Sequence, residues 1–312
     1  MDVNILNFDL EEWFHCDFIS DEETWSNHEV RIYESTNFIL NTLSKYDRKA
    51  TFFVLGWIAD KYPDIVKKIH SQGHEIGCHS MKHKLVHRLT PQQFRDDSRN
   101  AIDTIEQIIG EKIIMYRAPA FSITEETPWA FEILNELGIT HDASLFPAKR
   151  DYGGFAGLGK FDPLIIEING IHMKEFPLNI HKILNKSIVF SGGGYFRLFP
   201  YFLIKKWAKD SDYVMSYFHP RDFDKEQPYL THLPIMRKFK SYYGLKKSGA
   251  KFDVEKAKWF NHHYLMTKPN EELAEALLPT LAANGVAMTA DRVAMVCGMM
   301  KEKVQFIPEL FT

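Results

Sequence analysis

The sequence predicts an α/β fold, a mainly parallel sheet with helices outside it that is either open or closed into a barrel, followed by a small all-α segment. Short apolar runs alternate with segments of helical periodicity over about 140 residues, at the spacing of βαβ units. Polar residues recur where the predicted strands end. After about residue 248 this alternation stops, and only helical patterns follow.

The elements follow one another in a regular order. Apolar runs predict buried strands over 3–8, 50–56, 74–79, 112–119, 139–145, 164–168 and 212–220. Apolar residues at helical spacing predict helices over 31–46, 58–71, 91–109 and 125–137. A Thr90-Pro91-Gln92-Gln93 capping box begins the third helix. The last three helices are expected to end before glycines, at Gly73, Gly110 and Gly138.

Composition and charge restrict the class of protein. The 312 residues are 45% hydrophobic and 25% charged, as in ordinary globular proteins, and the net charge of -3 argues against an electrostatic binder of nucleic acid. No apolar run reaches the roughly 18 residues of a membrane span, and the start MDVNILNFDLEEWF lacks the regions of a signal peptide. No GxGxxG pattern joins a strand to a helix, so no nucleotide cofactor is predicted. We therefore expect a cytoplasmic protein without a nucleic-acid partner or a membrane span.

Four polar residues lie at the C-terminal ends of predicted strands, namely Asp9, His79, Arg117 and His219. The C-terminal edge of a parallel barrel is where such folds carry out chemistry. Four chemically versatile side chains on one edge are stronger evidence of a site than any one of them alone. The sequence therefore predicts the functional site at this edge.

The stretch GCHSMKH and the segment DLEEW supply candidate metal ligands. His79 and His83 are four positions apart, so in a short helical turn they could converge on one ion, although two surface histidines can share this spacing by chance. In an extended chain Asp9 and Glu11 point to the same side, so that one could bind the ion while the other acts on its water. The alternative is that Glu11 and Glu12 are solvated carboxylates.

These motifs resemble those of the polysaccharide deacetylases of the NodB-homology group, carbohydrate esterase family 4. Over residues 3–225 the agreement runs in order through FDLEEW, RKATFFVLGW, GHEIGCHSMKH, YRAPAFS, HDASLFP and SYFHPRDFD. The resemblance implies a distorted (β/α) barrel over residues 1–248 that removes an N-acetyl group from an amino sugar in bacterial surface-polysaccharide synthesis. The alternatives are a catalytically silent carbohydrate-binding protein on the same fold and a deformylase of a formamido sugar.

The resemblance also implies catalytic roles. Asp9 matches the catalytic base, His219 the catalytic acid and Arg117 the arginine that orients the base. Asp142 is a possible partner of Arg117. Three aromatic residues are candidates for lining a sugar site, although core packing explains the last of them equally well: Tyr152, Phe155 and Trp57.

The same resemblance implies a divalent metal ion, expected to be zinc, bound by Glu11, His79 and His83. The commonest motif of the family has an aspartate next to the base as its metal carboxylate. Here the pattern is D-x-E-E, so Glu12 remains the alternative to Glu11.

The last part of the chain, about 249–312, differs in character. KFDVEKAKWFNHHYLMTKPNEELAEALLPTLAANGV predicts two helices that meet at Lys268-Pro269-Asn270, and TADRVAMVCGMMKEKV predicts a third, capped by Thr289. The run KFDVEKAKWFNHHYLMT resembles part of a glutamyl-tRNA synthetase, without that enzyme's nucleotide-binding motifs. The resemblance implies a chimera whose C-terminal segment takes no part in the chemistry. The alternative is that these are the deacetylase's own terminal helices.

Overall fold

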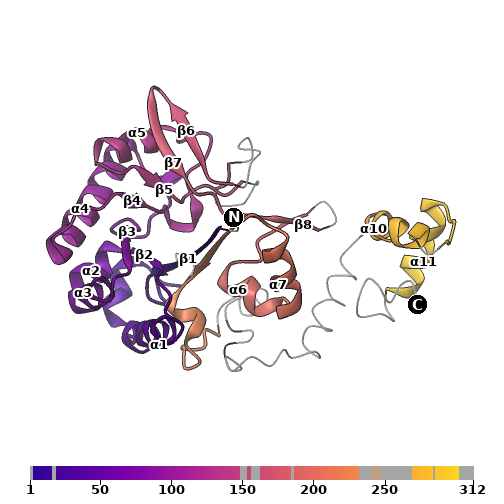
Figure 1. The fold of residues 1–312 in the computed structure, drawn as a ribbon, viewed down its shortest axis with the longest axis horizontal. Helices are drawn as coiled ribbons and strands as arrows, with labels where there is room; N and C mark the ends of the chain where they lie inside the picture. The colour runs from indigo at the N-terminus through magenta and orange to yellow at the C-terminus, as the bar shows by residue number, and fades with distance from the viewer. Residues whose placement is uncertain are drawn as a thin grey trace. The chain divides into compact units, whose positions relative to one another are not determined.

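A computed structural model describes residues 3–15, 19–147, 153–155, 162–183, 186–231, 242, 245, 269–283 and 285–301. The chain divides into two compact units, Met1–Ser248 and Gly249–Thr312 (Figure 1). Each unit is described separately below.

An eight-stranded sheet forms the centre of the first unit, in the order β10-β1-β2-β3-β4-β5-β7-β6. Its strands are β1 (Val3–Leu10), β2 (Thr51–Val54), β3 (Glu75–Cys78), β4 (Met115–Tyr116), β5 (His141–Asp142), β6 (Leu164–Ile168), β7 (Ile171–Glu175) and β10 (Tyr213–Phe218). Neighbouring strands are parallel except in the β6–β7 hairpin. The sheet curls into a half-barrel with helices outside it, so the predicted distorted (β/α) barrel is confirmed (Figure 1).

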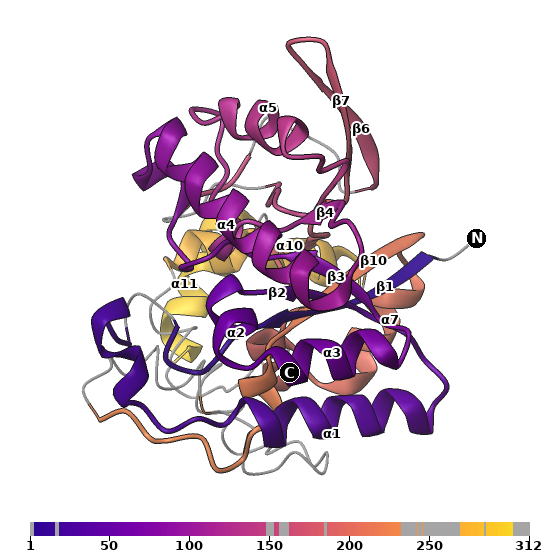
Figure 2. The same ribbon diagram turned by 90° about the vertical axis from the view of Figure 1, so that its left-hand side faces the viewer.

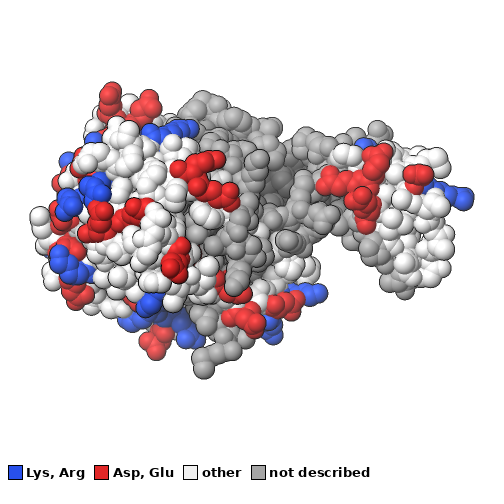
Figure 3. Space-filling model, turned by 90° about the horizontal axis from the view of Figure 1, so that it is seen from above, with Lys and Arg blue, Asp and Glu red and all other residues white. Residues whose placement is uncertain are grey.

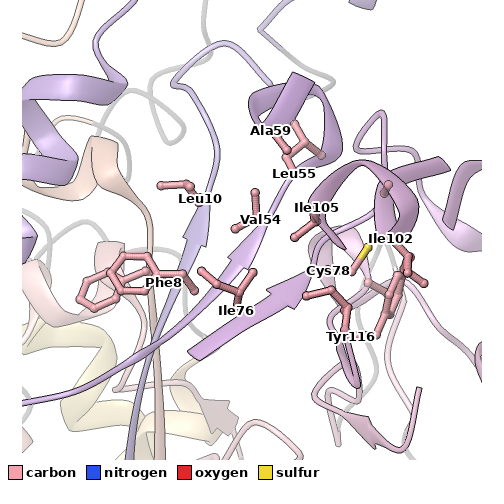
Figure 4. Close-up of a cluster of buried hydrophobic side chains, with 14 of the residues drawn as sticks. Phe8, Leu10, Val54, Leu55, Ala59, Ile76, Cys78, Ile102, Ile105 and Tyr116 are labelled. Atoms are coloured by element: carbon pink, nitrogen blue, oxygen red, sulfur yellow. The ribbon is translucent and has the colours of Figure 1, made fainter. Parts of the chain in front are cut away.

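Helices pack side by side over the outer face of this sheet (Figure 2). They are α1 (Ile32–Lys45), α2 (Gly56–Lys61), α3 (Pro63–Ser71), α4 (Pro91–Ile109) and α5 (Trp129–Glu136). Because successive side chains of a strand alternate between its faces, Phe8 and Leu10 of β1 enter the core beneath the helices (Figure 4). Asn7 and Asp9 of the same strand therefore point to the other face, inside the half-barrel.

Several predicted elements differ in the structure. The helix predicted over 58–71 is two helices, α2 and α3, because Pro63 disfavours helical backbone at Tyr62, whose φ is -133° and ψ 57°. The strand predicted over 112–119 is reduced to β4. Strand β7 was not predicted, although Asn169 and Gly170, both with positive φ, are typical of the hairpin turn that joins it to β6.

Four further elements of the first unit were also not predicted, namely β8 (His181–Ile183), β9 (Lys186–Ile188), α6 (Gly193–Leu198) and α7 (Tyr201–Lys209). The predicted capping box is confirmed: Thr90 Oγ1 accepts from the N–H of Gln93 at 3.2 Å, and Gln93 Oε1 accepts from the N–H of Thr90 at 2.9 Å. Gly110 ends α4 with φ of 74°, a conformation that favours glycine.

Helices α10 (Asn270–Ala283) and α11 (Ala290–Met300) form the described part of the second unit. They pack through Leu273, Leu277, Val293 and Cys297, which supports two of the three helices predicted there. Thr289 precedes α11 as predicted, but its side chain makes no capping hydrogen bond. The remaining predicted helix, with Lys268, lies outside the described residues.

Acidic and basic side chains are interspersed on the face that Figure 3 shows, without a continuous basic area among the described residues. No helix within the described ranges is both long and apolar enough to cross a bilayer.

Candidate active site

The carboxyl ends of β10, β1, β3 and β4, four of five consecutive strands in the sheet, bring the predicted site residues together. Asp9 and Glu11 lie at the end of β1, and His79 directly follows β3. Arg117 follows β4, and His219 follows β10. Because these strands are parallel, their carboxyl ends share one edge of the sheet, and none of these side chains is remote from it.

Glu11, His79 and His83 form a possible metal-binding triad. Each offers one ligand atom, and these atoms all lie within 4.8 Å of one another. The three side chains are buried, and Nε2 of His83 is 2.8 Å from Oε2 of Glu11. Two imidazoles and a carboxylate that leave a further position open are the ligand set of catalytic zinc sites, so these residues fit a divalent ion.

His79 is prepared to act as a ligand. Its Nδ1 is 2.7 Å from the carbonyl oxygen of Arg117, and because a carbonyl only accepts, Nδ1 carries the hydrogen and Nε2 presents its lone pair. Burial lowers the pKa of His79 to about 4, which keeps the ring neutral at neutral pH. Both properties are required of a metal-binding imidazole.

The backbone between the two histidines is not the helical turn that we predicted. Ser80 and His83 both have positive φ, 66° and 52°, which is uncommon for residues other than glycine. The N–H of His83 donates to Oγ of Ser80 at 3.1 Å, which ties this loop together. A looped conformation therefore brings His79 and His83 together, and unusual backbone of this kind is frequent at functional sites.

Arg117 and Asp9 form a buried ion pair. Nη1 of Arg117 donates to Oδ1 of Asp9 at 2.7 Å, and neither side chain is more than 4% exposed. The guanidinium also donates through Nε to the carbonyl oxygen of Ala143 at 3.2 Å, and it lies over the ring of Phe53 at 4.2 Å. The carboxylate of Asp9 is thereby held in one orientation.

His219 faces both carboxylates across a short gap. Its Nε2 is 3.9 Å from Oδ2 of Asp9 and 3.7 Å from Oε1 of Glu11. These distances exceed a direct hydrogen bond and leave a ring nitrogen beside Asp9 and the triad. In this arrangement the imidazole of His219 can supply a proton and the carboxylate of Asp9 can accept one.

Asp222 was missed in the sequence. Its Oδ2 lies 3.1 Å from Nδ1 of His219 and accepts from the N–H of His219 at 2.8 Å, while Arg197 of α6 bonds Oδ1. Burial alone would raise the pKa of Asp222, but the charge of Arg197 and the bond from His219 outweigh it and hold that pKa well below its usual range. Gly193 permits this approach, because a Cβ there would meet Asp222 at 1.9 Å. An acid three positions after a histidine, in HPRD, was the available signal.

Changing Asp222 to asparagine is expected to lower kcat for the amide hydrolysis that the sequence motifs predict by about 10–100-fold with little change in metal affinity, because His219 loses the carboxylate that orients its ring. Steady-state kinetics and metal titration of the variant would measure both. The exposed Asp64 of α3 offers a matched control, Asp64→Asn, which should behave as wild type. Equal kcat in D222N and wild type would contradict a role for this carboxylate.

Glu12, the alternative ligand, points away from the triad. Its Oε1 accepts from the N–H groups of Arg31 and Ile32 at 2.7 and 2.8 Å, at the start of α1, and Oε2 accepts from the N–H of Trp13 at 3.4 Å. It therefore serves as an N-cap for α1 supplied from a distant part of the chain. Burial, its largest influence, raises the pKa of Glu12 to about 7 in spite of these three bonds.

The raised pKa of Glu12 predicts a pH-dependent stability. Between the ordinary glutamate pKa and about 7 the folded protein holds a proton that the unfolded chain releases, so this stabilisation is lost as pH rises through 7. We expect Glu12→Gln to gain on the order of 2–3 kcal/mol in free energy of unfolding relative to wild type between about pH 4 and pH 8. Urea unfolding of both proteins across this range measures it. A difference that does not change with pH would contradict the assignment.

The weaker sequence predictions fare differently. Asp142 accepts hydrogen bonds from the N–H and Oγ of Ser144 at 2.8 and 2.7 Å, and the charge of Arg117 lowers its pKa against the larger effect of burial, so Arg117 acts on Asp142 through its charge. Trp57 is half-buried and packs against His15 and Trp25, with distances between ring centroids of 4.9 and 5.7 Å. Phe155 packs against the main core, and Tyr152 lies outside the described residues.

A family model described as polysaccharide deacetylase matches residues 28–141, which include His79, His83 and Arg117. Residues 28–141 therefore match the family to which the sequence motifs were compared. A second model, described as a domain of unknown function (DUF3473), matches residues 143–266 and includes His219 and Asp222. The peptidoglycan-N-acetylmuramic acid deacetylase PdaC of Bacillus subtilis is 37% identical over 92 residues, 30% of this chain and 20% of PdaC.

The fold of the first unit has a solved counterpart. The crystal structure of a Mycobacterium smegmatis protein classed as a polysaccharide deacetylase superposes with a TM-score of 0.53 at 17% identity, over 70% of this chain and 76% of that one. This level of identity supports the fold alone.

A second kind of relative matches this chain over 65 residues. The glutamate–tRNA ligase of Bacteroides thetaiotaomicron is 55% identical over 65 residues, 21% of this chain and 13% of the ligase. The predicted resemblance to a fragment of such an enzyme is therefore confirmed. The chain spans only 13–20% of the length of the ligase and of PdaC.

Proposed function

We propose that this protein is a metal-dependent N-deacetylase that hydrolyses the acetamido group of an amino sugar and releases acetate. The observation that carries the proposal is the position of the triad of Glu11, His79 and His83 beside an oriented carboxylate, Asp9, and an imidazole, His219, at one edge of the sheet. The match to polysaccharide deacetylases and the named activity of PdaC support a carbohydrate amide as the substrate.

Glu11, His79 and His83 would hold the ion, for which zinc suits the two nitrogen ligands and one oxygen ligand. A divalent ion there would polarise the acyl carbonyl and make a water molecule acidic enough to attack near neutral pH. The remaining steps depend on side chains of the protein.

Asp9 acts as the general base. Its Oδ1 is occupied by Arg117, which leaves Oδ2, on the side of His219, to accept the proton of the attacking water. Arg117 is a positioning residue, because its bonds hold Asp9 and the carbonyl of Ala143 and it is itself fully buried. A base held in one orientation before the substrate binds needs no rearrangement during the reaction.

His219 acts as the general acid. Its Nδ1 is held by Asp222, so that Nε2 faces the site and can give a proton to the departing amine. A catalytically silent carbohydrate-binding protein would have no need of both a base and an acid beside an intact triad. The arrangement therefore favours the enzyme over that alternative.

Acetate release tests the proposal. Purified protein loaded with Zn²⁺ is incubated with N-acetylglucosamine oligomers and with short peptidoglycan fragments, and acetate and formate are measured separately. We expect acetate, lost on chelation and restored by Zn²⁺. Formate release from N-formylated analogues alone would identify the deformylase, and release of neither acid from these probes would count against hydrolysis.

The source of the substrate and the role of the C-terminal segment are further parts of the proposed function. We propose that the substrate belongs to a bacterial surface polysaccharide or its precursor, handled in the cytoplasm, and that residues 249–312 take no part in the chemistry. The likeness to a ligase fragment supports a separate origin for the tail. The boundary near 248 is supported by the division into compact units, although the second family model extends to residue 266.

A further inference from the structure

Two acidic residues are buried side by side behind Arg117. Asp142 of β5 and Glu175 of β7 are partners in the parallel register of these strands, so their side chains stand on the same face of the sheet. Their exposed fractions are 1% and 0%, and the two carboxyl groups are in hydrogen-bonding contact. Neither the general base nor the metal triad includes them.

The hydrogen bonds of the pair leave one buried oxygen without a donor within the described part of the chain. Both oxygens of Asp142 accept from Ser144, and Oε1 of Glu175 accepts from the N–H of Leu145 at 3.1 Å. No donor of the described residues reaches Oε2 of Glu175, although it is buried. A buried carboxyl oxygen beside a carboxylate needs no donor of its own if it carries a proton and donates that proton to the carboxylate.

Electrostatics favours the same assignment. Two carboxylates cannot both stay ionised in contact and away from water, so one proton is retained between them. Arg117, a cation that acts on both groups, directs Nη1 to Asp9 and Nε to Ala143. Burial, followed by the charge of Asp142, raises the pKa of Glu175 well above its ordinary value.

A chain of bonds connects this pair to the active site. Ser144 Oγ donates to Asp142 and accepts from the N–H of Ala118 at 2.8 Å, next to Arg117. The carbonyl of Arg117 in turn fixes the tautomer of His79, and its side chain holds Asp9. One backbone segment thus positions both a metal ligand and the base.

We propose that Glu175 stays protonated and, by donating a hydrogen bond to Asp142, positions the Arg117 segment that orients Asp9 and His79. Because only the proposed function gives Arg117 and Asp9 their catalytic roles, the positioning role rests on it, whereas the protonation of Glu175 does not. Glu175 is a positioning residue, since it lies behind Arg117 and does not reach the reacting atoms.

Infrared spectroscopy of the full chain tests the proton. At about pH 9, above the pKa of Glu12, the difference spectrum between wild type and Glu175→Gln should contain the C=O stretch of a protonated carboxylic acid. The control Glu167→Gln, at an exposed position of β6, should remove no such band. Absence of the band from the Glu175 difference spectrum would overturn the assignment.

Zinc affinity and kinetics test the positioning. Glutamine at position 175 keeps a hydrogen-bond donor toward Asp142, whereas leucine has none. Glu175→Gln should therefore stay within about 3-fold of wild type in Zn²⁺ affinity and in kcat. Glu175→Leu should lose about 10–100-fold in both, with KM little changed. Ser144→Ala, a smaller change that is expected to fold, cuts the same chain and should give the same loss. Wild-type zinc affinity and kcat in Ser144→Ala, or equal losses in the glutamine and leucine variants, would overturn the role.

The two readouts separate this inference from the proposed function. Zn²⁺ affinity is measured by chelator competition without any substrate. If wild type released no acetate, the proposed function would fail, while the effect of Ser144→Ala on Zn²⁺ affinity would still decide whether the pair positions His79.

Discussion

Changing Asp9 to asparagine is expected to lower kcat by about 10²–10⁴-fold while Zn²⁺ stays bound, because the change removes the proposed general base and keeps the triad of Glu11, His79 and His83. Asparagine has the same shape as aspartate but cannot accept the proton of the attacking water. The Oδ1 atom that Arg117 bonds can remain an oxygen, so the geometry at 2.7 Å is retained.

D9N also removes the carboxylate that pairs directly with the buried guanidinium of Arg117. Breaking a buried ion pair costs about 3–5 kcal/mol of stability, so thermal unfolding has to be measured beside activity. Kinetics measured at temperatures below the unfolding transition then distinguish the loss of the base from the loss of the folded structure. A variant that lost its zinc together with its activity would show that Asp9 supports the metal site and would contradict the role of base.

His79→Ala is expected to remove about one equivalent of Zn²⁺ and, with it, nearly all acetate release. His79 is one of only three side chains that offer ligand atoms within 4.8 Å of one another in the described residues. Loss of a partner outside the ligand set already costs about 10–100-fold in metal affinity, so loss of a ligand should cost more than that.

The matched control is His87→Ala, which changes an exposed histidine a few residues beyond the same loop. It should keep wild-type metal content and activity. Metal analysis of the three proteins after identical loading with Zn²⁺ measures the difference. Full metal content in His79→Ala would show that His79 is not a metal ligand, whatever the activity of the variant.

The sequence by itself determined the mainly parallel sheet and the edge at which the polar residues gather, and it left open whether the sheet closes into a barrel. These follow from local physics: buried strands are apolar, parallel strands end at a common edge, and Asp9, His79, Arg117 and His219 stand where apolar runs stop. The Thr90–Gln93 capping box could be predicted for the same reason, since all its bonds are made within four residues.

Choices between neighbouring residues needed the tertiary structure. The sequence left Glu11 and Glu12 as alternative ligands, and their difference depends on α1, whose first N–H groups engage Glu12 from about twenty positions away in the chain. Likewise, the left-handed backbone of Ser80 and His83, and not helical spacing, brings the histidines together.

Contacts between distant segments were also decided only by the fold. Asp222 depends on Arg197 and on the close approach of Gly193, and the Asp142–Glu175 pair depends on a register between strands more than thirty positions apart. Strand periodicity can indicate which face a side chain occupies, but not which side chain of another strand it will meet there. For that physical reason the sequence located the edge of the site, while the packing of the half-barrel decided which residues orient it.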